Sequence, residues 1–168
     1  MTITVDTPTT TDTYAAHYGA LIMQATLGQV EQASVWYLEA QEVAEDVAEI
    51  MGTSLEVGAS IVSAFSPRER WASNVQKAYA FANGKPVAGL TNNLKMAQRA
   101  TELGFDALKG QKTNAFARAI AGDTSAVVID TWMLKAAGLD SSKGVNKTQY
   151  NELSDAVRRV ANDFGLTP

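Results

Sequence analysis

The stretch LKGQKTNAFARAIAGDTSAVVIDTW, residues 108–132, decides how we interpret the fold. It joins a lysine-bearing helix start after Gly110 to Asp130, which ends the apolar run AVVI. A helix of about ten residues from Lys112 advances ~15 Å, and about seven extended residues can retrace up to ~23 Å. The extended segment is therefore long enough to run back to the start of the helix. The spacing thus predicts that Lys112 and Asp130 face one cleft.

The start of this helix is also a predicted anion site. We expect Gly110 to supply the unusual backbone dihedrals of a tight hairpin. The free amides of Gln111, Lys112 and Thr113 would then attract a phosphate. Lys109 belongs to the same basic stretch of the chain. These residues are the predicted DNA contacts, together with Arg68 and Arg70, which open an earlier predicted helix.

Charge is unevenly distributed along the chain. The net charge is −4, but residues 1–65 contain nine acidic residues and no Lys or Arg. Residues 66–118 contain nine basic residues and three acidic ones. A polyanion would be attracted to this basic middle region, which makes DNA the predicted partner.

Length and composition indicate one globular domain. The chain has 168 residues, of which 46% are apolar, enough for a sizeable core. The absence of cysteine excludes disulfides, thiolate metal sites and iron–sulfur clusters. The N-terminal sequence has no signal-peptide pattern, and no segment approaches the roughly 18 apolar residues of a membrane span. We therefore expect a cytoplasmic protein with no membrane contact, no metal and no cofactor.

Apolar periodicity and turn residues predict an all-α fold. Residues 1–13 are rich in Thr and are expected to be a disordered tail. Residues 14–168 are expected to form a single all-α domain. It would comprise an acidic helical segment (14–65), a helix-hairpin-helix core (66–137), and a loop with a C-terminal helix (138–168).

Several local patterns predict where helices begin and end. TSLE (53–56) and SPRE (66–69) have capping-box spacing, with Ser66 as the cap, Pro67 in the first turn and Glu69 reaching back. Helices over 91–103, 111–121 and 148–164 are expected to end at glycines. In the helix over 29–51, an inward stripe is predicted at Trp36, Ala40, Val43, Val47 and Ile50; in the last helix it is predicted at Tyr150, Leu153, Val157 and Val160.

The same stretch resembles the helix-hairpin-helix DNA glycosylase superfamily, of the endonuclease III and AlkA type. That family has the hairpin LPGVGRKT followed by an apolar run ending in VDTH. The matching residues are Leu108, Gly110, Lys112, Thr113, Val128, Asp130 and Thr131. The segments SPRERWASNV, LKGQKTNAF and VVIDTWM look closer still to small relatives from bacteriophage and actinobacterial genomes, for which no activity is implied.

The resemblance implies base excision, in which a nucleotide is swung out of the duplex and its N-glycosidic bond is cleaved. Asp130 would stabilise the cationic sugar and orient the attacking water. Lys112 matches the amine that attacks the sugar carbon in members that form a Schiff base. The chain departs from the family at four points: LKGQKT is two residues shorter than LPGVGRKT, Trp132 stands in place of His, no cysteine cluster follows, and the segment before the hairpin is short.

Simpler interpretations stand beside each of these roles. Asp130 is also a plausible N-cap, and Lys112 a plain phosphate contact or solvated residue. Trp36 and Trp71 are expected to be core anchors, and His17 is assigned no chemistry. A protein without catalysis, binding DNA or protein through the same scaffold, is the alternative.

The acidic N-terminal helices offer a third possibility. Their carboxylate stripe is either a solvated face or a surface for a homodimer or a partner protein. A di-metal site is not predicted there, because no Glu-x-x-His pair is present. The stripe comprises Glu39, Glu42, Asp46 and Glu49.

Overall fold

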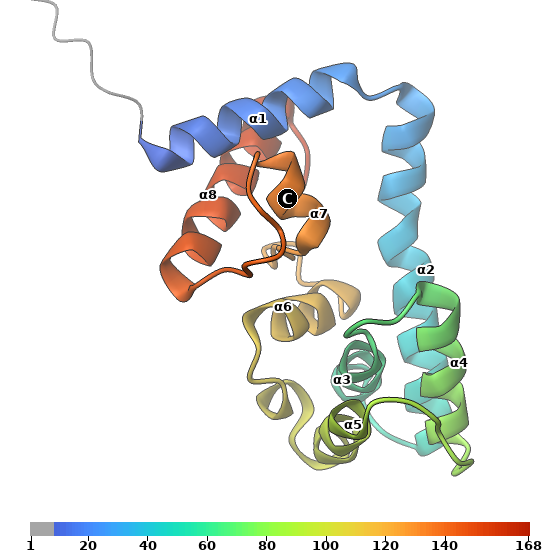
Figure 1. Ribbon diagram of the computed structural model, residues 1–168. Helices are drawn as coiled ribbons and strands as arrows, with labels where there is room; N and C mark the ends of the chain where they lie inside the picture. The colour runs from blue at the N-terminus through green and yellow to red at the C-terminus, as the bar shows by residue number, and fades with distance from the viewer. Residues whose placement is uncertain (1–8) are drawn as a thin grey trace, which may run out of the picture. The chain divides into compact units, whose positions relative to one another are not determined.

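The computed structural model describes residues 9–168, apart from the side chain of Ser34. Within these residues every regular element is a helix, and no strand occurs, so the predicted all-α class is confirmed. Residues 126–129, predicted to be a short extended piece outside any sheet, belong to no helix or strand. The elements are α1 (Thr10–Gln24), α2 (Leu27–Met51), α3 (Leu55–Phe65), α4 (Trp71–Ala82), α5 (Thr91–Leu103), the 3-10 helix η1 (Gly104–Ala107), α6 (Gln111–Ile120), α7 (Thr131–Ala136) and α8 (Lys147–Phe164) (Figure 1).

The helices form two compact units. Unit 1 combines α1 with α7 and α8, from residues up to Thr26 and from Ile129 onward; unit 2 contains α2 to α6, over Leu27–Val128. This division crosses the predicted segments. The acidic segment 14–65 contributes α1 to unit 1 and α2 and α3 to unit 2, and the segment 66–137 is likewise shared.

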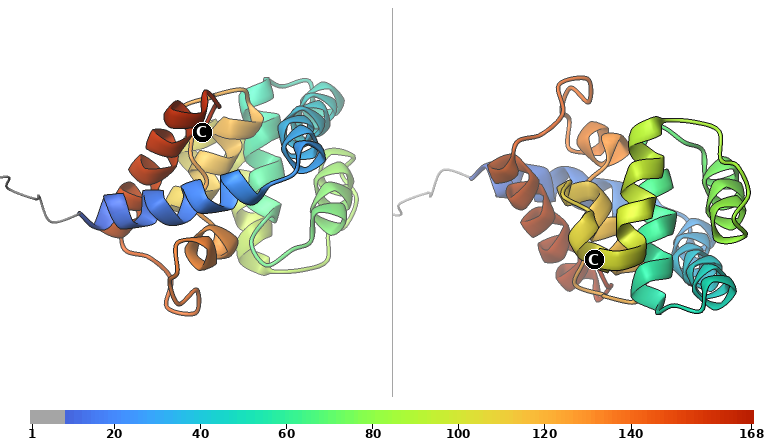
Figure 2. Two further views of the ribbon diagram at one scale, coloured as in Figure 1. Left: turned by 90° about the horizontal axis from the view of Figure 1, so that it is seen from above. Right: turned by 90° about the horizontal axis from the view of Figure 1, so that it is seen from below.

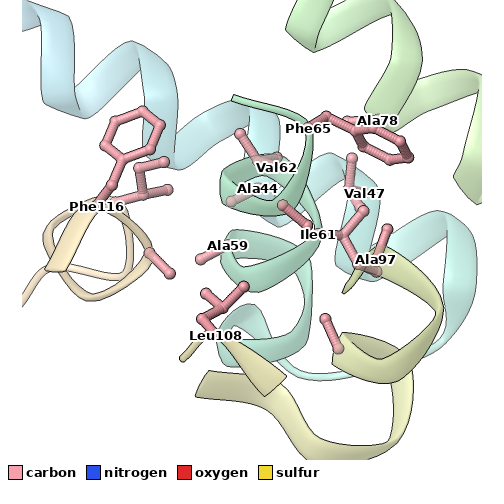
Figure 3. Packing of buried hydrophobic residues seen from close by; sticks show 14 of the residues in the cluster. Ala44, Val47, Ala59, Ile61, Val62, Phe65, Ala78, Ala97, Leu108 and Phe116 are labelled. Atoms are coloured by element: carbon pink, nitrogen blue, oxygen red, sulfur yellow. The ribbon is translucent and has the colours of Figure 1, made fainter. Parts of the chain in front are cut away.

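Helix α3 is the centre of unit 2. All of its residues from Gly58 to Phe65 are buried, and it packs against α2, α4, α5 and α6. A helix that is apolar on every side is stable only when neighbours surround it. Figure 3 shows Ile61, Val62 and Phe65 of α3 among side chains from the other helices.

Helices α2 and α3 cross very closely. Ala40 and Ala44 of α2 are fully buried, and a Cβ added to Gly58 of α3 would lie 2.1 Å from the Ala44 carbonyl oxygen. Only a residue without a side chain fits at that crossing. The predicted inward stripe of α2 is confirmed at Ala40 and Val47, but it is wrong at Ile50, which is 45% exposed.

The two tryptophans predicted as core anchors do pack against the core of unit 2. The ring centroids of Trp36 and Trp71 are 5.0 Å apart, and Trp36 stacks on Phe116 at 6.0 Å. These contacts link α2 with α4 and α6.

Unit 1 is held by contacts of α1 with α7 and α8 (Figures 1 and 2). His17 Nδ1 donates to the Ala137 carbonyl at 2.8 Å, and Tyr18 Oη donates to the Met133 carbonyl at 3.1 Å. Burial raises the pKa of Tyr18 to about 12. The hydrogen bonds of His17 and Tyr18 therefore connect the end of α7 to α1.

The predicted inward stripe of α8 faces the interior of unit 1. Tyr150, Leu153 and Val160 are buried, and Val157 is half-buried. Gly165 follows the helix with a left-handed φ of 66°, as the predicted stop requires. Gly104 and Gly122, with φ of 52° and 91°, likewise follow α5 and α6.

Helix α1 begins earlier than predicted. Thr9 and Asp12 form a reciprocal capping box, so residues 10–13 belong to the helix rather than to a tail. These hydrogen bonds from Thr9, together with Arg159, lower the pKa of Asp12 to about 2. The rest of the predicted tail, residues 1–8, lies outside the described residues.

The predicted helix start at SPRE is wrong. Ser66 ends α3, Arg68 has a left-handed φ of 63°, and α4 begins only at Trp71 after Arg70. Glu69 does not reach back; it accepts hydrogen bonds from Ser73 and Lys77, which lower its pKa. The chain must reverse after the buried α3, and this tertiary requirement overrides the local capping signal.

The helix start predicted at TSLE (53–56) agrees with the observed start of α3 to within one residue. Ser54, rather than Thr53, caps α3 by accepting from the Val57 amide. Glu56 then accepts from the backbone N–H of Phe105 at 3.1 Å and fixes the end of α5.

No single helix among the described residues is long and apolar enough to cross a membrane. The pair α2 and α3, bent by 113° at its break, passes that test only by combined length and composition.

Candidate nucleic-acid interface

The turn from η1 into α6 lies in unit 2 and carries the predicted phosphate contacts. Gly110 is the N-cap of α6, with φ of −77° and ψ of 132°. These are ordinary extended dihedrals, so the prediction of unusual backbone dihedrals at Gly110 is wrong. Side-chain hydrogen bonds to the backbone shape the turn instead.

Asn114 is the residue that closes this turn. Its side-chain amide donates to the carbonyl oxygens of Phe105 at 3.0 Å and Leu108 at 3.3 Å. Thr113 Oγ1 donates to the Gly110 carbonyl, and Ser63 of α3 donates to the Thr113 carbonyl at 2.7 Å. Sequence reasoning missed Asn114; the available signal was an Asn in the first helical turn, where its amide competes for backbone partners.

The start of α6 is electrostatically positive. No side chain caps the helix, and the amides of Gln111, Lys112 and Thr113 have no acceptor within the part of the chain that is described. Residues 109–112 are exposed, including the ammonium groups of Lys109 and Lys112. Free amides, the helix dipole and two cations together form an anion-attracting surface.

Most other basic side chains of residues 66–118 are also exposed to solvent. Eight of the nine basic residues in 66–118 are exposed. Only Lys77 forms an ion pair there, with Glu69, among the residues that the structure describes. Arg68 and Arg70 are both exposed, at the turn before α4. The guanidinium of Arg118, in the last turn of α6, lies 4.6 Å from the ring centre of Phe105 in η1.

Asp130 is the N-cap of α7 in unit 1, so its interpretation as a cap is confirmed. Its Oδ1 accepts from the backbone N–H groups of Trp132 and Met133, both at 2.9 Å. The carboxylate is half-buried. Its negative charge adds to the burial that raises the pKa of Tyr18.

Trp132 follows this cap and faces solvent. Its side chain is 72% exposed, and the Lys135 ammonium lies 4.5 Å from its ring centre. An exposed Trp with a neighbouring cation is suited to stacking against an aromatic ligand such as a base. Sequence reasoning treated Trp132 only as a substitute for the family His.

Lys112 and Asp130 belong to different units, unit 2 and unit 1. Their convergence on one cleft remains a prediction.

Two cavities lie away from Lys112 and Asp130. One, of about 140 Å³ in unit 2, is lined by Phe65, Lys77 and the loop before α5; the other, of about 280 Å³ in unit 1, is lined mainly by apolar side chains of α1, α7 and α8. Neither includes Lys112 or Asp130. No group of three or more potential metal ligands occurs in residues 9–168.

The fold and the basic turn define an all-α protein with an exposed, uncapped helix start as its candidate anion site. The chain belongs to a family of unknown function, DUF7178, which it matches over residues 1–168. Comparisons with curated proteins and with solved structures find no match.

Proposed function

We propose that this protein binds DNA through the turn between η1 and α6. The observation that carries the proposal is the exposed start of α6, where three backbone amides with no acceptor in residues 9–168 lie with Lys109 and Lys112. Such a group binds the phosphate backbone without reading sequence. The resemblance of residues 108–132 to helix-hairpin-helix glycosylases supports the same assignment.

Salt dependence of DNA binding tests this proposal. A fluorescein-labelled duplex is titrated with the full chain between 50 and 200 mM salt, and anisotropy gives the dissociation constant. Each phosphate contact contributes about 0.9 to the log–log slope. The double variant Lys109→Ala/Lys112→Ala is therefore expected to bind more weakly and to lose roughly 2 from the slope.

Lys85→Ala is the matched control, because Lys85 is an exposed lysine of the same unit that lies outside the turn and has no ion pair among the residues described. It should lose less affinity than the double variant. Salt-independent binding, or equal losses in both proteins, would exclude the turn as the phosphate site.

The proposal extends to cleavage of the N-glycosidic bond of a modified or damaged base. Water would add its hydroxyl to the sugar C1′, while the base leaves with the bonding electrons and takes up a proton. Asp130 would stabilise the cationic sugar. Lys112 would act as the amine in a lyase branch.

Asp130→Asn separates this chemistry from folding, since Asn also caps helices well. On a panel of duplexes with uracil, oxidised and alkylated bases, the wild type should cleave at least one and Asp130→Asn none. Borohydride trapping that depends on Lys112 would identify the lyase branch.

A DNA-binding protein without catalysis is the second candidate. The observation that favours it is that Oδ1 of Asp130 is already occupied by two backbone amides. Absence of cleavage across the panel, with salt-dependent binding retained, would select this candidate.

A further inference from the structure

The outward face of α2 carries a continuous stripe of exposed side chains. At about 100° per residue, seven positions of this helix fall within an arc of roughly 80°. All seven are exposed, and none forms an ion pair within the described part of the chain. We call them the α2 stripe: Leu27, Glu31, Val35, Leu38, Glu42, Glu45 and Glu49.

The opposite face of α2 attaches the helix to unit 2. Ala40, Ala44 and Val47 are fully buried there, and Trp36 packs on Trp71 and Phe116. No residue of α2 before Ala40 is buried among those whose side chains are described. The first turns of α2 extend beyond the other helices of unit 2 (Figure 1).

The stripe has an apolar half and an acidic half. In the first half, Leu27, Val35 and Leu38 are 84%, 48% and 61% exposed, which leaves large apolar side chains adjacent in water. The second half presents Glu42, Glu45 and Glu49, whose mutual repulsion no basic residue of α2 relieves. From Glu31 to Glu49 the positions recur at 4, 3, 4, 3 and 4, the spacing by which one helix packs along another.

We propose that the α2 stripe binds one amphipathic helix of a partner protein, apolar at one end and rich in Lys or Arg at the other. Charge complementarity selects this occupant. A second copy of α2 would bring like carboxylates together if paired in parallel and would bury them against the apolar half if paired antiparallel, whereas a basic helix end neutralises three of them. The apolar end would cover Val35 and Leu38 in a helix-on-helix contact.

A synthetic helix tests this inference with the full chain. The probe is a fluorescent peptide of about three heptads. It carries Leu at the positions facing Val35 and Leu38, and Lys at those facing Glu42, Glu45 and Glu49. A second peptide has the same composition in scrambled order. The wild type is expected to bind the patterned peptide at least tenfold more tightly than the scrambled one.

Variants of each half locate the contact. Glu42→Lys/Glu49→Lys and Val35→Gln/Leu38→Gln are each expected to weaken patterned-peptide binding about tenfold. Glu102→Lys and Leu103→Gln are the controls, since both change exposed residues of α5 in the same unit and should have no effect. Circular dichroism checks that all variants remain folded.

Equal affinity for both peptides, or equal losses in the control variants, would overturn the proposal. So would a concentration-dependent dimer, seen by sedimentation and abolished by Leu38→Gln, because the occupant would then be a second copy. DNA binding at the α6 turn is measured separately and can succeed or fail independently.

Discussion

The carboxylate of Asp130 has an observed structural role as a helix cap and a proposed catalytic role. Its Oδ1 accepts two backbone hydrogen bonds that start α7, which any Asp before a helix can do. Stability and activity must therefore be measured separately at this position.

Substitutions of Asp130 should separate the two roles. Asp130→Ala removes the cap and is expected to lower the free energy of unfolding by about 1 kcal/mol. Asp130→Asn should cost much less, since its side-chain oxygen still accepts. Urea unfolding followed by circular dichroism measures both. Equal losses would mean that the negative charge, rather than the hydrogen bonds, stabilises α7.

Gly104 has a backbone conformation that disfavours any side chain. Its φ of 52° and ψ of −131° strain any other residue, and an added Cβ would lie 2.3 Å from Glu56 Oε1. Gly104→Ala is expected to destabilise the protein by roughly 1–3 kcal/mol. Gly84 has a φ of 67°, but an added Cβ there would meet no other atom. Gly84→Ala should therefore lower the free energy of unfolding by less, and its loss measures the backbone strain alone. Urea midpoints compare the two, and a smaller loss for Gly104→Ala would refute the clash with Glu56.

At the scale of elements, the crossing of α2 and α3 depends on small residues. Gly58→Ala places a Cβ 2.1 Å from the Ala44 carbonyl oxygen, and both atoms lie on packed helices. Relief requires a shift of the backbone, so we expect a loss of about 1–3 kcal/mol or more. Thermal unfolding measures it.

Gly28→Ala is the matched control for that crossing. Gly28 is also helical, in α2, but has no atom within 4 Å of the added Cβ. Alanine is the better helix former, so this variant should be stabilised by up to about 1 kcal/mol. If Gly58→Ala also stabilised the protein, the close crossing would be disproved.

At the scale of the whole molecule, two tyrosines report on the two units. Tyr18 lies in unit 1 and Tyr79 in unit 2, where it donates to Asp46 at 2.6 Å. Burial raises the pKa of each phenol from 10.0 to about 12, and for Tyr79 the hydrogen bond to Asp46 adds to the effect.

The raised pKa values predict a loss of stability in strong base. The folded state holds these protons more tightly than the unfolded state, so the stabilising contribution is complete below pH 10. It decreases as the pH rises from 10 toward 12. Denaturation at successive pH values should show this decline, and absorbance at 295 nm should show late phenol ionisation.

Phenylalanine variants assign the effect to a unit. Tyr18→Phe and Tyr79→Phe should each remove part of the pH dependence between 10 and 12. A curve unchanged in both variants would show that other groups are responsible.

Much of the fold was predictable because it depends on local preferences. Period-3.6 apolar stripes and glycines at the ends of α5, α6 and α8 predicted the all-α class and most helix limits. The prediction failed at SPRE and at Gly110. Ser66 is the C-cap of the preceding helix α3 and so does not begin a new one, and at Gly110 the hydrogen bonds of Asn114 close the turn while the glycine keeps ordinary dihedrals.

The candidate site was predictable only in its parts. The lysines at the start of α6, the absence of a side-chain cap there and the cap at Asp130 all follow from neighbours within a few positions in the chain. The inward packing of α3 and the exposure of Trp132 and of the α2 stripe do not, because side-chain burial depends on residues distant in sequence. Sequence alone therefore determined the helices and their charges, whereas tertiary packing decided which of their faces remain open to a ligand.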